Sequence, residues 1–195
     1  MNLDVVFSGV GGQGVVVLSD VYCEAAMLDG FDVAKAEIHG MAQRGGSIVA
    51  YARIGDKVES PLIETGKADV IVGFEILETA RAIPMLKRDG DVIVNMKYIP
   101  PSCAVPGTKQ KKTEELLQII RSKAKVHEVD GVGIAEKLGN LLVVNTILLG
   151  ALSALPEIPV KQESFQQAIA SRLKEKYINL NLKAFQLGRE TVLTN

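Results

Sequence analysis

The feature that most constrains the fold is a glycine-rich segment, GVGGQG at residues 9–14, which separates two stretches of different character. Before it, residues 3–8 form a short run of β-branched and aromatic side chains, which is typical of a strand. After it, residues 15–29 contain neither Pro nor Gly, which favours a helix that ends at Gly30. The order of strand, glycine turn and helix predicts the first unit of an α/β fold.

A second glycine cluster, HGMAQRGG at residues 39–46, follows the next strand candidate at residues 32–38. Glycine costs conformational entropy on folding, so this density marks backbone that must adopt positive φ or let another group approach closely. The cluster also stands where a regular alternation of strands and helices would place a helix. We therefore expect a ligand or a partner to meet the edge of the sheet that carries both clusters.

The rest of the chain predicts the architecture. Residues 47–54 alternate like a strand, Gly55 and Asp56 supply a turn, and residues 57–60 are expected to return as the partner strand of a hairpin. Alternation then resumes as continuous apolar runs, which are typical of parallel strands covered on both faces. The expected elements are strands at residues 68–74, 91–96 and 125–129, and helices at residues 76–87, 113–123 and 134–138.

The C-terminal third, from residue 141 onward, reads as helical, with Pro156 and Pro159 as breaks. At 195 residues the length favours one domain over residues 1–195. The expected fold is α/β: a Rossmann-like, mostly parallel sheet with an inserted β-hairpin and a helical C-terminal third.

Composition argues against several classes of function. Lys and Arg number 22 against 23 Asp and Glu, which leaves no electrostatic footprint for nucleic acid or an anionic membrane surface. The longest apolar stretch, residues 138–155, contains Asn and Thr and is expected to be a buried helix. The start of the chain lacks the pattern of a secretory signal, so we expect a cytoplasmic protein. Cys23 and Cys103 are isolated, so no metal or cluster site can be built from them.

The first glycine cluster also matches the dinucleotide fingerprint G-x-G-x-x-G, which would direct N–H groups and a positive helix end toward a phosphate. Glu37 stands about 20 residues later, where a ribose-binding acid would be. NAD or FAD binding is therefore an alternative. Against it, Gly12 and Gln13 place an amide side chain in the turn, and the second cluster replaces the usual second helix.

Several polar residues near the glycines are candidates for contact with a ligand or partner. Gln13 can bind a ligand or satisfy the backbone of its own turn. Arg44, flanked by Gly45 and Gly46, suits a carboxylate or phosphate, or else forms a salt bridge to Glu37 or Glu75. His39 either titrates near neutral pH or serves as a hydrogen-bonding residue of the loop.

Glu75 and Asn95 follow two further strands at the edge where open α/β sheets bind ligands, although a first-turn acid and a turn-forming Asn would have the same sequence. The sequence holds no Ser/His/Asp signature, Walker loop or catalytic CxxC, so no catalytic residue is expected on this chain. The candidate contact residues are Gly11, Gly12, Gln13, Gly14, His39, Gln43, Arg44, Gly45, Glu75 and Asn95.

The two clusters together, GVGGQG at residues 9–14 and EIHGMAQRGGS at residues 37–47, resemble the gamma domain of the 2-oxoacid:ferredoxin oxidoreductases. Within that family, the HGMAQRGG form is similar to the beta subunits of the indolepyruvate branch. Further similarity lies at residues 73–75, 92–95 and 145–150, so the resemblance covers most of the chain.

The resemblance implies a domain that works beside a larger alpha subunit, which carries thiamine diphosphate and 4Fe-4S clusters, while this chain binds no cofactor alone. The implied reaction is oxidative decarboxylation of an arylpyruvate with coenzyme A, giving aryl-acetyl-CoA, CO2 and reduced ferredoxin. Another 2-oxoacid (pyruvate, 2-oxoglutarate or 2-oxoisovalerate), a free-standing nucleotide-dependent oxidoreductase, and a noncatalytic interaction module are the alternatives.

Overall fold

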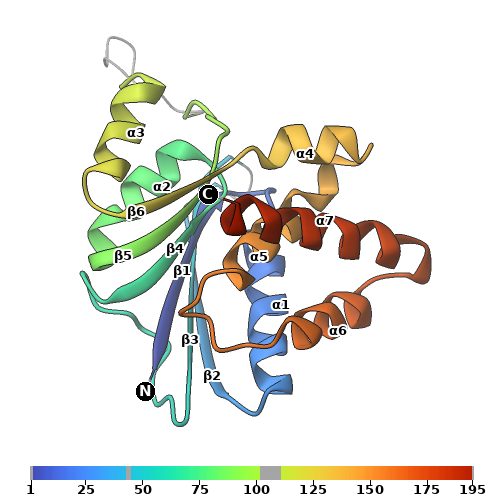
Figure 1. Cartoon of the computed structure of the whole chain (residues 1–195). Helices are drawn as coiled ribbons and strands as arrows, with labels where there is room; N and C mark the ends of the chain where they lie inside the picture. The colour runs from blue at the N-terminus through green and yellow to red at the C-terminus, as the bar shows by residue number, and fades with distance from the viewer. Residues whose placement is uncertain (1, 43–44, 102–110, 195) are drawn as a thin grey trace.

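A computed structural model describes residues 2–42, 45–101 and 111–194 of the chain. Its centre is a six-stranded sheet with the order β2-β3-β1-β4-β5-β6, and helices cover both faces (Figure 1). The strands are β1 (Leu3–Val10), β2 (Asp32–His39), β3 (Ser47–Gly55), β4 (Ala68–Gly73), β5 (Leu86–Asn95) and β6 (Lys125–Val129). The predicted fold class, a mostly parallel α/β sheet with a helical C-terminal third, is confirmed.

The middle of the sheet explains the continuous apolar runs of the sequence. Strands β1, β4, β5 and β6 pair in parallel, whereas β3 lies antiparallel between β2 and β1. Side chains alternate between the two faces of a strand, and both faces of β1 are covered. Val5, Val6 and Phe7 are therefore all fully buried, with Val6 on the opposite face from the other two.

The helices form two layers on opposite faces of the sheet (Figure 1). The larger layer contains α1 (Val15–Leu28), α5 (Val144–Ser153), α6 (Gln162–Arg172) and α7 (Glu175–Leu193). The smaller layer contains α2 (Ile76–Ala82) and α3 (Thr113–Arg121), and α4 (Gly131–Lys137) follows β6. Two short 3-10 helices, Ile83–Met85 and Leu141–Val143, precede β5 and α5. Among the described residues, no helix combines the length and apolarity that a membrane crossing requires.

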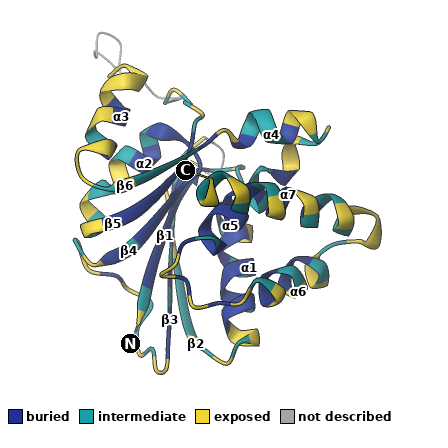
Figure 2. Cartoon of the chain, viewed as in Figure 1, coloured by how far each residue is buried: buried dark blue, intermediate teal, exposed yellow. Residues whose placement is uncertain are grey.

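Close contacts hold the larger layer together. Phe7 of β1, Tyr22 of α1, Phe165 of α6 and Phe185 of α7 form a row of aromatic rings whose centroids lie 5.7, 6.3 and 5.8 Å apart. Figure 2 shows that buried residues continue along the strands and the inner sides of α1 and α5. This buried layer fixes the two helices whose ends meet at the glycine clusters.

The predicted hairpin is wrong in its second strand. Residues 57–60 form no strand, and β3 instead pairs with the preceding β2, so the second glycine cluster is the hairpin connection. Side-chain contacts hold residues 57–60 in place: Asp32 accepts the Val58 N–H at 2.8 Å, and Arg53 donates to the Ser60 carbonyl at 3.1 Å. The sequence signal failed because a turn at Gly55 and Asp56 does not show which strand supplies the partner.

The predicted helix at residues 76–87 is too long at its C-terminal end. It ends at Ala82 and passes into a 3-10 turn that contains Pro84, since proline lacks the N–H group that a longer helix needs. The following residues join β5, which therefore begins at Leu86 rather than residue 91. The pairing of β4 with β5 shifts register in this region, which accommodates the additional residues.

Candidate functional site

The two glycine clusters lie against each other. The Gly11 N–H donates to the Gly46 carbonyl at 2.8 Å, and the Gly45 N–H donates to the Gly11 carbonyl at 3.4 Å. The antiparallel pairing of β1 with β3, which reaches Val10 and Ser47, brings the two segments together. We call this surface, formed by residues 9–14, 39–42 and 45–46, the glycine edge.

Helix α1 begins at the glycine edge, and no side chain among the described residues caps it. Its N-cap residue, Gly14, has φ 83°, makes no side-chain cap hydrogen bond, and no acidic residue stands in the first turn. A Cβ atom on Gly14 would overlap Nδ2 of Asn145, whereas a Cβ on Gly12, with φ 101°, would meet nothing within 4 Å. Gly14 thus allows α5 to approach, while Gly12 presents bare backbone to open space. The uncapped N–H groups and the helix dipole favour a negative group at this position.

Two amide side chains bind the carbonyl of Phe74, the residue that follows β4. Nε2 of Gln13 donates to it at 3.2 Å, and Nδ2 of Asn95 donates to it at 3.0 Å. The Gln13 oxygen also accepts the Val10 N–H at 2.7 Å, and the Asn95 oxygen accepts the Gly131 N–H at 3.1 Å. Both amides therefore hold the strand ends together, and Gln13 satisfies the backbone of its own turn.

Glu75 caps helix α2. The carboxylate is fully buried and accepts the N–H groups of Leu77 at 3.0 Å, Ile99 at 3.1 Å and Glu78. Burial raises the pKa of Glu75 above its ordinary value, although these N–H bonds oppose the rise. The Glu75 carboxylate is enclosed by the first turn of α2 and does not line the cleft described below.

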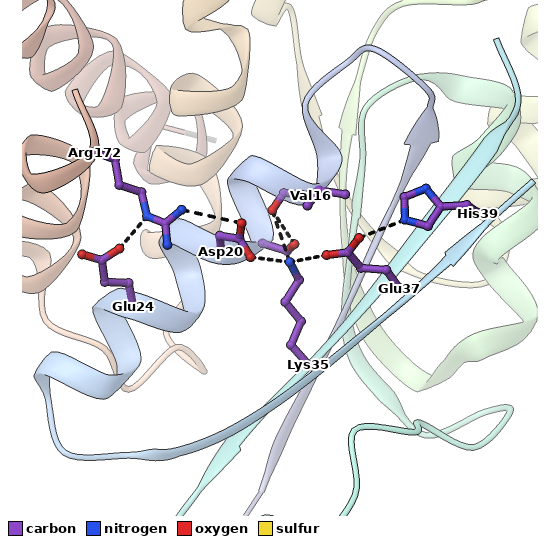
Figure 3. Close-up of polar contacts among 8 residues, drawn as sticks. Val16, Asp20, Glu24, Lys35, Glu37, His39 and Arg172 are labelled. Carbon is purple, nitrogen blue, oxygen red and sulfur yellow. Dashed lines mark hydrogen bonds and ion pairs between the residues drawn. The ribbon is translucent and has the colours of Figure 1, made fainter. Parts of the chain in front are cut away.

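Glu37 and His39 face α1 from the end of β2 (Figure 3). A Glu37 oxygen lies 2.7 Å from Nζ of Lys35, and its other oxygen lies 2.9 Å from Nε2 of His39. The hydrogen bond from Lys35 is the main reason that the pKa of Glu37 lies below its ordinary value, although burial opposes it. The acid that stands at the ribose position of the dinucleotide fingerprint is thus occupied within the chain, which disfavours that alternative.

Gln43 and Arg44 lie outside the described residues. Their contact roles, and the salt bridges predicted from Arg44 to Glu37 or Glu75, stay predictions. The neighbouring Gly45 is exposed and has φ 77°, a conformation that glycine adopts without strain.

A cleft of about 460 Å³ opens beside the start of α1. Of the predicted residues, it brings together Gly12, Gln13, Gly14 and Asn95, whereas His39 and Glu75 do not line it. The other described residues that line it are Phe74, Lys97, Ile99, Val132, Leu141, Leu142, Val144 and Asn145.

Sequence reasoning did not single out Lys97, Leu141 or Leu142 for this cleft. Lys97 lies two residues beyond β5, so its distance from a strand end at the ligand-binding edge was an available signal. Leu141 and Leu142 are 58% and 83% exposed, so the expectation of a buried helix over residues 138–155 is wrong at this point. Asn140 caps the short 3-10 turn there through the Leu142 N–H, which leaves the two leucines outside the core.

The described lining of the cleft is suited to binding. Its described lining residues include one cation, two Asn, one Gln and an apolar wall, but no Ser, Cys, His, Asp or Glu. Within the described part of the chain, no group of three His, Cys, Asp or Glu residues is placed to hold a metal ion. Cys23 is buried in the core, which raises the pKa of its thiol to about 12. The arrangement fits an anionic group carried by an apolar ligand, or a partner side chain of that character.

The chain is similar to known proteins over nearly its whole length. Residues 4–191 match the family model described as pyruvate ferredoxin/flavodoxin oxidoreductase. A protein of Archaeoglobus fulgidus named indolepyruvate oxidoreductase subunit IorB is 40% identical over 190 residues, which span 96% of this chain and 94% of that protein. The pyruvate/ketoisovalerate oxidoreductases common subunit gamma of Thermococcus litoralis is 32% identical over 184 residues, covering 93% and 92% of the two chains.

Solved structures share the fold. The pyruvate oxidoreductase subunit PORC of Thermotoga maritima matches with a TM-score of 0.75 at 26% identity, covering 97% of this chain and 96% of that one. The gamma subunit of a keto/oxoacid ferredoxin oxidoreductase from Geobacter sulfurreducens gives 0.74 at 25% identity, with 99% of each chain covered. The family resemblance predicted from the two glycine clusters is confirmed.

Proposed function

The chain belongs to the pyruvate ferredoxin/flavodoxin oxidoreductase family, and from this premise we propose that it is the smaller subunit of an indolepyruvate:ferredoxin oxidoreductase. The observation that supports this proposal is sequence identity. The chain is 37–40% identical to proteins named indolepyruvate oxidoreductase subunit IorB, but 30–32% identical to the common gamma subunits of the pyruvate and ketoisovalerate enzymes. In the proposed reaction, an aryl 2-oxoacid and CoA give aryl-acetyl-CoA, CO2 and reduced ferredoxin.

The proposal assigns thiamine diphosphate and the 4Fe-4S clusters to a larger alpha subunit, which also brings ferredoxin into the complex. The described lining of the cleft offers no thiolate, the ligand that iron–sulfur clusters require, so a cluster does not fit there. The part left to this chain is to bind and orient. The isolated chain is accordingly expected to be inactive.

The glycine edge is the surface that we assign to this role, facing the partner subunit where the 2-oxoacid or CoA approaches. Gly11 and Gly12 are assigned to close approach of another molecule to the backbone, whereas Gly14 makes room for Asn145 of α5. The amides of Gln13 and Asn95 keep the edge in shape, and Lys97 adds a positive charge beside the uncapped start of α1. CoA carries phosphate groups and a long pantetheine arm in which methyl and methylene groups alternate with two amides, which agrees with the mixed polar and apolar lining of the cleft.

Anaerobic reconstitution with the larger subunit tests the proposal. The purified chain and the cluster-bearing subunit are assayed separately and together with ferredoxin, CoA and a panel of 2-oxoacids. We expect turnover only from the mixture, with arylpyruvates preferred over pyruvate and 2-oxoglutarate by at least about tenfold, the discrimination that a fitted apolar pocket provides. A preference for pyruvate would assign the chain to another branch of the family. Turnover with NAD(P) by the isolated chain would overturn the proposal altogether.

A further inference from the structure

A network of charged and titratable side chains crosses the outer side of α1 and joins it to β2 and α6 (Figure 3). This network, called the charged network below, comprises Asp20, Glu24, Lys35, Glu37, His39 and Arg172. It connects the helix that begins at the first glycine cluster with the strand that ends at the second. Whether the charged network holds the glycine edge in place depends on the positions of Lys35, Glu37 and His39 on β2.

The pleat of β2 directs its part of the network toward α1. Lys35, Glu37 and His39 occupy every second position and therefore share one face of the strand. The β3 residues opposite Lys35 and Glu37 are Ala52 and Ala50, both fully buried. Because alanine is small, the long side chains of Lys35 and Glu37 can extend over β3 toward the helix.

Lys35 is the bridging member. Its ammonium forms ion pairs with Asp20 of α1 and with Glu37, the latter at 2.7 Å, and lies 3.5 Å from the carbonyl of Val16 in the first turn of α1. Its side chain is only 17% exposed. Burial lowers the pKa of Lys35, but the hydrogen bonds and charges of Asp20 and Glu37 outweigh it and hold the pKa above its ordinary value. Lys35 and Glu37 are thus both ionised, and their ion pair is better shielded from solvent than a fully exposed salt bridge.

The network reaches the second glycine cluster through His39, the last residue of β2, which contacts Glu37 at 2.9 Å. The other end of this cluster is bonded to the first cluster, because Gly46 accepts the Gly11 N–H. The connection between β2 and β3 is therefore held at both ends, by charged side chains on one side and by backbone on the other.

We propose that Lys35 and Glu37 are positioning residues for the glycine edge. They fix His39, and with it the start of the second cluster, relative to the first turn of α1. Glu37 then acts through Lys35 and His39 instead of through a ligand. The inference rests on the proposed function only for its effect on turnover, because the position of the edge can be measured without the reaction.

Hydrogen exchange of the full chain tests the positioning. In Lys35→Met, the amides of Gly40 and Gly11, which bond to Ser47 and Gly46 across the edge, should exchange at least about fivefold faster because the strand end opens more often. The control is Arg172→Met, which removes a cation from the α6 end of the same network, with Asp20 and Glu24 as partners. It should leave both amides unchanged. Equal acceleration in both variants, or none in Lys35→Met, overturns the inference.

Turnover of the reconstituted complex tests the consequence. Lys35→Met should lower kcat about tenfold with little change in KM, since small misplacement of a contact costs rate strongly. Lys35→Arg, which keeps the charge, should restore kcat to within about threefold, and Arg172→Met should behave as wild type. Similar losses in Lys35→Met and Arg172→Met would show a merely structural role. A wild-type complex without turnover would refute the proposed function, while the exchange result would still decide the positioning.

Discussion

Helices α1 and α2 both begin at the same edge of the sheet, yet their first turns are satisfied in opposite ways. The first turn of α2 is closed by its own chain, because Glu75 accepts two N–H groups of the helix and a third from Ile99. The first turn of α1 has Gly14 as its N-cap and no side-chain cap. A helix start that no side chain of the described residues caps, beside an open cleft, is available to an external group, whereas a capped and buried one is not. We therefore propose a binding role for the first turn of α1, whereas Glu75 stabilises the first turn of α2.

The largest effect is expected from Gly12→Val. At φ 101° a β-branched residue is strained, and the added side chain would project into the open space where another molecule is proposed to approach. We expect kcat/KM of the complex to fall by about 100-fold, while the unfolding free energy falls by only about 1–2 kcal/mol.

Gly30→Val is the matched control for that change. Gly30 has φ 85°, its Cβ position is equally open, and it lies beyond the other end of α1. It should show the same loss of stability in urea unfolding with nearly normal turnover. If both valine variants lose turnover alike, the first turn of α1 has no special role.

Glu75→Ala is expected to have its main effect on stability. It leaves three N–H groups without their carboxylate partner in a buried position, which should cost about 2 kcal/mol in urea unfolding. Asp130→Ala, which removes the exposed N-cap of α4, should cost about 1 kcal/mol. Turnover of the assembled complex should stay near wild type in both. A selective loss of turnover in Glu75→Ala would mean that this helix entrance also contacts the ligand.

The pH dependence of the unfolding free energy also tests whether the Glu75 carboxylate is buried. The pKa of Glu75 is raised in the folded chain. Above that pKa, the fold is therefore less stable with the ionised carboxylate than it would be with the protonated carboxyl, and this penalty vanishes as pH falls below the ordinary pKa of 4.5. The unfolding free energy of the wild type relative to Glu75→Gln should therefore increase as pH is lowered from 7 toward 4.5. A difference that is flat or declines over this range would contradict the burial of the carboxylate.

Lys97→Met should have the smallest effect. Removing this cation from the cleft should raise KM for CoA about fivefold, with kcat and thermal stability unchanged, as expected for an exposed charge that contacts an anion. Lys123→Met replaces an exposed lysine at the opposite ends of the strands and should leave KM unchanged. An equal response to both variants would indicate only a general effect of net charge.

Much of the fold follows from local sequence signals. The alternation of apolar runs with helical segments predicts the parallel core, and the glycine turn at residues 9–14 marks the first strand-to-helix passage. Strand β6 and the start of α1 were predicted to the residue; Gly14 precedes α1, and Asp130 and Gly131 follow β6. Strand pairing is harder to predict, since the residues of β3 do not show whether the preceding β2 or a following segment lies beside it.

The site was predictable in its location but not in its division of roles. The same residue types serve as ligands and as structural partners, so the sequence left both roles open for Gln13, Glu75 and Asn95, and the structure shows that their polar atoms are used within the chain. Lys97 could have been predicted from its place just beyond the end of β5, but local patterns do not show that Leu142, about 45 residues later in the chain, lines the same cleft. The two glycine clusters were informative because backbone at positive φ favours glycine, which can be recognised directly in the sequence.

Helices α5 and α7 touch backbone to backbone. A Cβ on Gly150 would overlap the Phe185 carbonyl, and one on Gly188 would overlap the Ile147 carbonyl. Thr146 of α5 also donates to the Asn181 side chain of α7 at 2.6 Å, one residue from the cleft wall. No residue of α7 lines the cleft, but α7 packs against α5, whose first residues Val144 and Asn145 do line it. A truncation or a bulky fusion at the C-terminus would therefore alter binding at a distance, whereas the N-terminus, at the far end of β1 from the glycine edge, is the safer place for a tag (Figure 1).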